Sequence, residues 1–399
     1  MSIQFLQGDC LTVLKTLPDS SIQCCVTSPP YYGLRDYKVE GQRGNEATPD
    51  EYVKGMVDIF REVKRTLRDE GTLWLNLGDT YAANRTYQAP STKGGAKHSP
   101  AQASQSANKV PEGLKAKDLI GIPWRVAFAL QQDGWYLRAA CPWIKRNSMP
   151  ESAKDRPTTV IEHMFMLTKT NSPYYDHQAV KVECSPDMRR RAAAGHTRGA
   201  AGKLDASRND QDSLRGEHAK KIDVSKGRAR RTSDWFFESW QGLLQDGDEE
   251  PMAFIVNTKP YKGAHFACFP PDLVRPCILA STSEKGCCPD CGAPYERVTE
   301  REPSDWQTER KAAGEPVRHG LSGAAASGAG GFKDEVSHTT GWKPTCDCAH
   351  KDPIPQTILD PFGGSGTTAQ VAQEHGRNAI LIELNSDYIE LAKKRCGVS

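Results

Sequence analysis

The sequence predicts an α/β fold with a mostly parallel sheet and helices on both faces. Two stretches carry this prediction, because each follows a short apolar run that is typical of a buried strand. The first is Thr27-Ser28-Pro29-Pro30-Tyr31-Tyr32, directly after the run from Ile22 to Val26. The second is the glycine-rich turn from Asp360 to Thr368, between the pair Ile358-Leu359 and a helical pattern. Alternation of strands and helices along the chain implies parallel strands joined by crossovers.

The first stretch has the chemistry of a clamp for a planar group that carries an NH2. Two consecutive prolines fix φ and remove two backbone donors, so the carbonyls of Ser28 and Pro29 are held in one geometry. The Ser28 oxygen and the Pro29 carbonyl can accept both amino hydrogens, and Tyr31 offers a ring for stacking. An amine held in this way loses conjugation with its ring and becomes nucleophilic. Taken by itself, the stretch is equally compatible with a Pro-rich loop that exposes a tyrosine.

The glycine-rich turn has the features of a ligand-binding loop. Glycines let the backbone approach a ligand closely, and the helix N-terminus offers unpaired N–H groups. The next strand, from Asn378 to Ile382, ends at Glu383, which lies 23 residues after Asp360. An acid at that distance in a βαβ unit suits a ribose diol, whereas the spacing of the glycines differs from the G-x-G-x-x-G pattern of NAD sites. A tight turn without a ligand is the alternative.

Together the two stretches resemble the DNA amino-methyltransferases, which move a methyl group from S-adenosylmethionine to N4 of cytosine or N6 of adenine. Ser28, Pro29, Pro30 and Tyr31 are similar to the catalytic motif of that family. Their S-P-P-Y form is more usual for N4-cytosine enzymes, whereas adenine enzymes more often carry D-P-P-Y or N-P-P-Y. The resemblance implies cofactor-binding roles for Asp9, Asp360, Phe362, Gly363, Gly364, Gly366, Thr367 and Glu383. For Asp9, which would read the adenine of the cofactor, a helix N-cap is an equally good interpretation.

The catalytic motif precedes the cofactor loop, as in the permuted subgroup of the family called beta. The resemblance, which covers roughly residues 1–180 and 255–399, therefore implies a permuted, Rossmann-like, S-adenosylmethionine-dependent methyltransferase fold. It implies a catalytic half (1–180), a basic target-recognition insertion (181–254) and a cofactor-binding half (255–286 and 353–399). Composition adds a mobile loop at 84–110 to the catalytic half, and a zinc-binding insertion (287–352) departs from the usual layout of the family.

Strands and helices alternate in the first part of the chain. A short strand from Ile3 to Leu6 precedes a helix that Pro18 ends, and residues 33–47 are expected to form an exposed loop. Thr48-Pro49-Asp50-Glu51 is a capping box with proline at the first helical position. It opens an amphipathic helix that Gly71 is expected to end, before a strand over residues 72–77.

The polar stretch 84–108 has the composition of a mobile loop, which either closes over a substrate or is an insertion without function. A helix begins near Pro123 and is closed by Gly134. Strands follow over 136–144 and 161–168. The resemblance places these two strands at the far edge of the sheet, with Lys145 and Asn147 near the site.

A basic segment follows these strands. Residues 181–231 hold 14 Lys and Arg against 7 Asp and Glu, so the segment carries +7 while the rest of the chain carries −5. The clusters Arg189-Arg190-Arg191 and Arg228 to Arg231 are followed by Trp235-Phe236-Phe237 and Trp240. Basic groups interleaved with aromatic rings suit phosphate contacts and base packing, and in related enzymes this interval recognises the target. A solvated basic loop is the simpler alternative.

Four cysteines have the spacing of a structural zinc site. Cys288 and Cys291 form a C-x-x-C knuckle, and Cys346 and Cys348 form a distant C-x-C pair. Cys287 could take the place of Cys288, and ordinary thiols remain an alternative. A redox dithiol lacks the βαβ context that thioredoxin-like motifs have.

Composition sets the remaining expectations. The chain of 399 residues with 37% hydrophobic content can bury a sizeable core, and no apolar run approaches the ~20 residues that span a bilayer. Its start lacks the pattern of a signal peptide, so a cytoplasmic protein without a membrane partner is expected. The expected partners are double-stranded DNA and, through the resemblance, a cognate restriction endonuclease, with the chain a monomer or homodimer. The alternatives are an N6-adenine enzyme, a methyltransferase of RNA or protein amides, and a non-catalytic nucleic-acid-binding protein, against which the glycine loop and Glu383 weigh.

Overall fold

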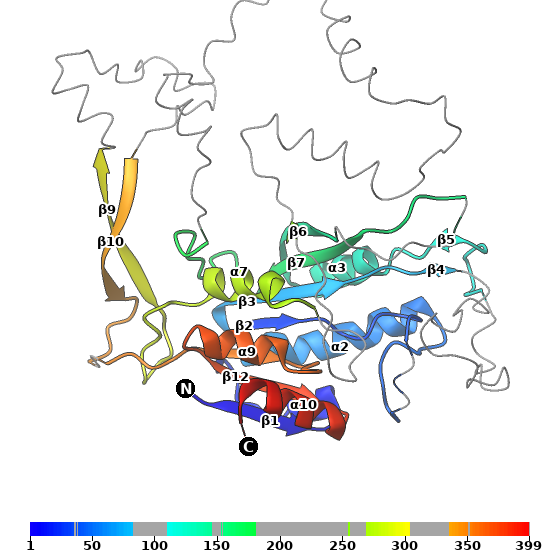
Figure 1. The fold of residues 1–399 in the computed structure, drawn as a ribbon, viewed down its shortest axis with the longest axis horizontal. Helices are drawn as coiled ribbons and strands as arrows, with labels where there is room; N and C mark the ends of the chain where they lie inside the picture. Colours follow the sequence, from blue (N-terminus) through cyan, green and yellow to red (C-terminus); the bar gives the residue numbers. More distant parts are fainter. Residues whose placement is uncertain are drawn as a thin grey trace, which may run out of the picture.

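The structure is a computed structural model, and it describes residues 1–35, 37, 39–82, 110–145, 153, 155–180, 254–255, 269–303, 335–349 and 352–398. The described residues form an α/β fold around an eight-stranded sheet of order β1-β12-β11-β2-β3-β7-β6-β8, with β1 at one end (Figure 1). The strands of this sheet are β1 (Ile3–Gln7), β2 (Ile22–Thr27), β3 (Leu67–Leu77), β6 (Tyr136–Ile144), β7 (Ile161–Thr168), β8 (Phe254–Ile255), β11 (Thr357–Asp360) and β12 (Asn378–Glu383).

The predicted parallel sheet is confirmed. Strands β1, β12, β11, β2 and β3 are parallel, while β7 is antiparallel to β3 and β6 is antiparallel to β7. The carboxyl ends of the parallel strands therefore meet at one edge, which we call the catalytic edge because the two stretches with the predicted site residues begin there. The chain runs outward from β2 to β3 on one side and from β11 to β12 on the other. This reversal between β11 and β2 is the position where open α/β sheets leave a crevice for ligands.

Helices cover both faces of the sheet. They are α1 (Cys10–Leu14), α2 (Pro49–Thr66), α3 (Ile122–Gln132), α7 (Pro271–Ser281), α9 (Thr367–Glu374) and α10 (Ser386–Cys396). Side chains of α1, α2 and α3 share one core cluster with Cys25, whereas those of α7 and α9 share another with Cys24. Because successive strand residues point to opposite faces, Cys24 and Cys25 show that the two clusters lie on opposite faces of the sheet. The fold therefore has three layers, with the sheet between two layers of helices.

The expected start of α2 is confirmed and its expected end is wrong. Thr48 Oγ1 accepts from the N–H of Glu51 at 3.2 Å, and the Glu51 carboxylate accepts from the N–H of Thr48, which completes the capping box. The helix ends at Thr66 and not at Gly71, because Leu67 is already extended (φ −67°, ψ 142°). Gly71 lies inside β3, beside a register shift against β2.

The first helix is also shorter than expected. It ends at Leu14 instead of continuing to Pro18. The N–H groups of Thr16 and Leu17 bond to carbonyls three residues back, Val13 and Leu14, so tight turns replace the last α-helical turn.

Two small sheets lie outside the main one. Strands β4 (Tyr81–Ala82) and β5 (Asp118–Leu119) form a short pair, and β9 (Tyr295–Pro303) and β10 (Glu335–Pro344) form an antiparallel hairpin that stands apart from the sheet in Figure 1. Several expectations lie outside the described residues: the mobile loop over 84–109, the basic insertion over 181–253, and Asn147. Within the described part of the chain, every helix is too short or too polar to cross a membrane.

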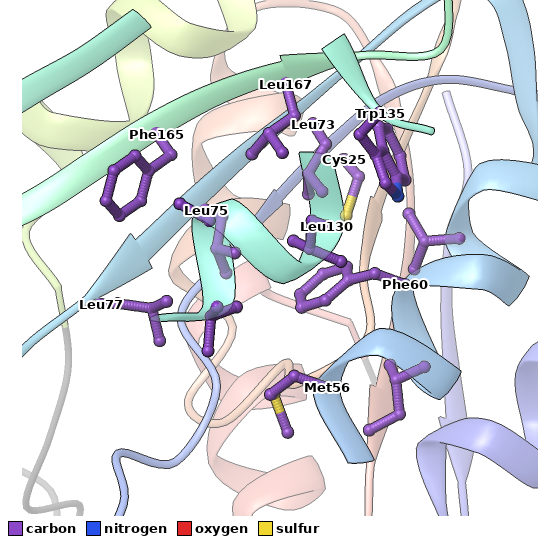
Figure 2. Close-up of a cluster of buried hydrophobic side chains, with 14 of the residues drawn as sticks. Cys25, Met56, Phe60, Leu73, Leu75, Leu77, Leu130, Trp135, Phe165 and Leu167 are labelled. Carbon is purple, nitrogen blue, oxygen red and sulfur yellow. The ribbon is translucent and has the colours of Figure 1, made fainter. Parts of the chain in front are cut away.

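The larger core lies between the sheet and helices α2 and α3. Figure 2 shows Phe60 of α2 close to Leu130 of α3, in the cluster that also contains Leu73 and Leu75 of β3. All four side chains are fully buried. A ring in this position joins both helices to the strand that ends next to the site.

Replacing Phe60 by alanine is expected to lower the free energy of unfolding by about 3–5 kcal/mol, because the lost ring leaves a cavity between rigid elements. Urea denaturation of the purified chain measures this change. Phe128→Ala on α3 is the matched control, since that ring is 50% exposed and its loss should cost less than about 1 kcal/mol. Equal losses in the two variants would contradict the assignment of Phe60 to the main core.

Candidate active site and metal centre

The catalytic edge brings together side chains from five parallel strands. Asp9 follows β1, Ser28 follows β2, and Asn76 is the penultimate residue of β3. Asp360 and Glu383 are the last residues of β11 and β12. The two sequence stretches that predicted the fold are therefore neighbours in space, although more than 300 residues separate them in the chain.

Asp360 joins these two stretches directly. Its Oδ1 accepts from Thr27 Oγ1 at 2.7 Å and from the N–H of Phe362 at 3.1 Å, and its Oδ2 accepts from Thr368 Oγ1 at 2.7 Å. The carboxyl group is completely buried. Burial raises the pKa of Asp360 to about 6, against the hydrogen bonds from the two threonines, which favour the charged form.

A cavity opens beside this bridge, and many of the predicted site residues line it. The structure places these predicted residues on its wall: Asp9, Ser28, Pro30, Phe362, Gly363, Gly364, Thr367 and Glu383. Four others, Pro29, Tyr31, Asp360 and Gly366, lie outside its lining. The loop expected to be exposed also forms part of the wall, because Tyr37, Val39, Gly41, Gln42 and Arg43 all line the cavity. Its exposure is confirmed in part, since Glu40, Asn45 and Ala47 are exposed, but polar composition does not reveal which cavity a loop covers.

Glu383 and Asp9 lie at the carboxyl ends of β12 and β1 and line the cavity there. The two carboxylate oxygens of Glu383 accept from the N–H groups of Gly364 and Asn385, each at 2.8 Å, and burial raises the pKa of Glu383. A carboxylate has about four acceptor positions, so Glu383 retains capacity to accept from a ligand hydroxyl. Asp9 caps α1 by accepting from the N–H of Thr12 at 3.0 Å, and it also pairs with Arg43 at 3.6 Å. The N-cap interpretation of Asp9 is thus confirmed alongside its place on the cavity wall.

Two of the loop glycines are required by packing within the protein. A Cβ at Gly363 would lie 2.9 Å from the side chain of Leu381, on β12. A Cβ at Gly366, whose φ is +81°, would lie 2.8 Å from the Cβ of Ala392, on α10. Gly364 (φ +49°) instead donates its N–H to Glu383. The glycine pattern therefore serves close packing of the loop as well as the backbone that lines the cavity.

A second polar network surrounds the catalytic motif. The Tyr31 hydroxyl lies 2.7 Å from Glu162 Oε2 and 2.8 Å from Asn76 Oδ1, and Lys145 pairs with the other oxygen of Glu162. Ser28 Oγ donates to Asn76 Oδ1 at 3.2 Å. Burial and the neighbouring Glu162 carboxylate raise the pKa of Tyr31 well above its usual value, so the side chain stays a neutral phenol. The expected place of Lys145 near the site is confirmed, whereas Asn76 and Glu162 were missed.

Buried residues fix the backbone of the catalytic motif, residues 28–31. The hydroxyl of the buried Tyr52, on α2, donates to the carbonyl of Pro30 at 2.9 Å. The ring of Tyr31 lies close against Gly78, where an added Cβ would be 2.5 Å from its Cε2 atom.

A signal for Asn76 existed in the sequence, since it is the one amide in the apolar end of β3.

The four cysteines of the predicted metal site meet as expected. The Sγ atoms of Cys288, Cys291, Cys346 and Cys348 all lie within 4.8 Å of one another. Four thiolates at about 2.3 Å from a tetrahedral zinc ion are compatible with this spacing. Cys287 is not part of the group, because its buried thiol points to the carbonyl of Ile354 at 3.6 Å.

The cysteine cluster lies at the amino ends of the parallel strands, opposite the catalytic edge. Arg68, at the start of β3, donates to the carbonyl of Cys291. Arg297 of β9 forms an ion pair with the buried Asp176 at 3.0 Å and another with Glu284 at 2.8 Å. A metal held there would be remote from the cavity and could act only on the fold.

Comparisons with known proteins agree with this geometry. A family model described as DNA methylase, of the N6 and N4 methyltransferases, matches residues 22–291 and 351–394. The Type II methyltransferase M.Cfr9I of Citrobacter freundii is 37% identical over 390 residues, which are 98% of this chain and 86% of that protein. The Type II methyltransferase M.SmaI of Serratia marcescens is 32% identical over 99% of this chain and 90% of its own length.

A solved structure shares the fold. The PvuII DNA methyltransferase (cytosine-N4-specific) superposes with a TM-score of 0.50 at 15% identity, covering 99% of this chain and 86% of that one. At this identity the likeness concerns the arrangement of strands and helices.

The raised pKa of Asp360 predicts a specific pH dependence of stability. The folded state holds the proton up to about pH 6, whereas the unfolded state releases it near 3.8. The contribution of this group is therefore fully present below the lower value and is lost as the pH rises through the higher one, a fall of up to about 3 kcal/mol. Denaturation of wild type and Asp360→Asn between pH 4 and 7 should show the wild type losing stability relative to the variant.

Asp50→Asn serves as the control, since the Asp50 carboxylate is 88% exposed. A difference between wild type and Asp360→Asn that stays constant over this pH range would show that Asp360 is ionised throughout.

Proposed function

The chain belongs to the N6 and N4 DNA methylase family, and on that premise we propose that it transfers a methyl group from S-adenosylmethionine to N4 of cytosine in double-stranded DNA. The observation that carries the proposal is the shared cavity. Ser28 of the catalytic motif lines the same cavity as Gly364 and Glu383 of the cofactor stretch. A cofactor in this cavity would lie beside the residue that holds the target amine.

The residues of the cavity fit S-adenosylmethionine. Glu383 would accept from the ribose hydroxyls with its remaining lone pairs, and Asp9 would accept from the amino group of the adenine. The apolar ring of Phe362 and the backbone of Gly363 and Gly364 would pack against the ligand. When bound, the cofactor supplies an electrophilic methyl group on a positively charged sulfur.

The catalytic motif would position the amine. The target base must leave the duplex for its amine to reach the methyl group. Ser28 Oγ and the Pro29 carbonyl would accept the two amino hydrogens, and the ring of Tyr31 would stack on the base. Methyl transfer then needs no covalent intermediate with the protein, so catalysis consists mainly of orientation.

The choice of cytosine N4 rests on the S-P-P-Y form of the motif at residues 28–31. A serine hydroxyl and a carboxylate can each hold an amino hydrogen, so the chemistry alone admits N6 of adenine as well. The Type II names of the relatives support a further proposal, that the methylation protects DNA from a cognate restriction endonuclease.

Digesting DNA methylated by the purified chain to nucleosides and identifying the product by mass spectrometry tests the proposal. N4-methylcytosine is the expected product. N6-methyladenine without N4-methylcytosine would overturn the choice of base. Ser28→Ala is expected to lower the rate about 100-fold or more, because one of two amine acceptors is lost. Wild-type protein that binds DNA and S-adenosylmethionine but forms neither product would contradict the activity itself.

We also propose that Cys288, Cys291, Cys346 and Cys348 hold one structural zinc ion. Four thiolates complete a tetrahedral shell and leave no position for a reactive water. The place of the cluster, opposite the catalytic edge, supports a role in folding of the β9–β10 hairpin.

Metal analysis of protein purified without chelator is expected to give one zinc ion per chain. Cys288→Ser should lose that zinc and melt at a lower temperature, because metal binding is coupled to folding. Cys287→Ser, the adjacent position outside the cluster, should retain it. Zinc retained in Cys288→Ser and lost in Cys287→Ser would make Cys287 the ligand in place of Cys288. A wild-type protein without zinc would contradict the proposed zinc site.

A further inference from the structure

The Ser28 hydroxyl can hydrogen-bond in two opposite senses, and only one of them suits an amine. A hydroxyl donates one hydrogen and accepts through its lone pairs. If the hydrogen points at the target base, the site attracts a carbonyl oxygen. If the hydrogen points away, the site presents lone pairs and attracts an NH2 group. The residue that receives the hydrogen of Ser28 therefore decides which kind of base edge is held.

Asn76 is placed to receive that hydrogen. Its side chain is completely buried, and its Oδ1 lies 3.2 Å from Ser28 Oγ. Within the described residues, Tyr31 is the other side chain recorded as a hydrogen-bond partner of the Ser28 hydroxyl, at the longer distance of 3.4 Å.

The orientation of the Asn76 amide is fixed from the opposite side. Its Nδ2 donates to the backbone carbonyl of His163, on β7, at 3.3 Å. A carbonyl oxygen can only accept, so the NH2 end of the amide must face His163 and the oxygen must face Ser28. A carbonyl oxygen has two lone pairs, and Asn76 can therefore accept from Ser28 whether Tyr31 gives its one hydrogen to Asn76 or to Glu162.

We propose that Asn76 is a positioning and specificity-determining residue. It accepts the hydroxyl hydrogen of Ser28, so that the lone pairs of the Ser28 oxygen face the target amine. The site thereby selects amino groups over carbonyl groups at the same place on a base. This inference rests on the proposed function, since it assigns Asn76 a role through Ser28. A buried asparagine whose only role is to hydrogen-bond polar groups at the strand ends would have no such effect on base choice.

A double-mutant cycle tests the dependence on Ser28. At saturating DNA and cofactor, Asn76→Leu is expected to lower the methylation rate about 10- to 100-fold when Ser28 is present. In the Ser28→Ala background the same change should cost less than about threefold, because no hydroxyl remains to be oriented. In Tyr31→Phe the effect of Asn76→Leu should persist. An equal loss with and without Ser28 would overturn the proposal.

DNA binding supplies a readout that does not require activity. Duplexes carrying cytosine or uracil at the target position present an amino group or a carbonyl oxygen at the same site, with the adjacent ring nitrogen changing from acceptor to N–H donor. Hypoxanthine replaces adenine in the same way if the product is N6-methyladenine. Wild type should bind the amino form more tightly, and Asn76→Leu should reduce this preference about tenfold, since the freed hydroxyl can donate to the carbonyl. An unchanged preference would contradict the proposal.

The controls separate this role from loss of folding. Gln23→Leu removes another buried amide of the same sheet, whose Oε1 accepts from the N–H of Thr357 at 2.7 Å, far along β2 from the site. It should lower stability without changing the preference between the two duplexes. Calorimetric binding of S-adenosylmethionine confirms that each variant is folded, and Asn76→Ala replaces the leucine variant if that one does not fold. Wild type without methylation activity would reject the proposed function, whereas an active wild type with an additive cycle would reject only the role of Asn76.

Discussion

The arrangement of the site depends on the hydrogen bonds that the carboxyl group of Asp360 accepts. It accepts hydrogen bonds from a threonine at the end of β2 and from a threonine at the start of α9, residues that are 333 and 8 positions away in the chain. Burying an acid is costly, and among the described residues the groups that act on Asp360 include no basic side chain, so its pKa rises. The contact persists because β11 and β2 are adjacent strands, so the backbone already holds both threonines within reach. In a permuted chain, where the two motifs are at opposite ends of the sequence, this contact joins them directly.

The second network follows the same principle of using strand ends as fixed supports. Asn76 and Glu162 are on neighbouring antiparallel strands, and their side chains converge under the motif of β2. Strand side chains vary less in position than loop side chains, which suits a reaction that depends on orientation. The prolines of the motif provide rigidity along the chain, and these polar contacts provide it across the sheet. Hydrogen-bond direction, rather than charge, is then the quantity that the site controls.

The sequence was sufficient for the sheet and for many of the residues that line the cavity, because both depend on local patterns. Apolar runs placed the strands, a capping box placed the start of α2, and proline and glycine spacing marked the two stretches that meet at the catalytic edge. The errors occurred where tertiary contacts decide. Helix α2 ends before Gly71 because β3 pairs with β2 from Leu67 onward, and the loop over residues 33–47 covers the cavity through contacts that its composition does not encode. Glu162 was missed because a single acid in a strand has no distinguishing spacing. The glycines at 363 and 366 were expected for their ligand, and the structure adds their close contacts with β12 and α10.

The hairpin insertion between α7 and β11 leaves and re-enters the core at one place. Cys287 and Ile354 exchange two backbone hydrogen bonds of 2.9 Å, and Gly286 allows this junction because a Cβ there would lie 2.3 Å from the carbonyl oxygen of Ile354. A segment whose two ends already touch imposes no distance on the rest of the chain, and the entropy of closing such a loop changes slowly with its length. The insertion is therefore a self-contained appendage of the core. Its length and sequence can change without a change in the distance between α7 and β11, or in the geometry at the other edge of the sheet.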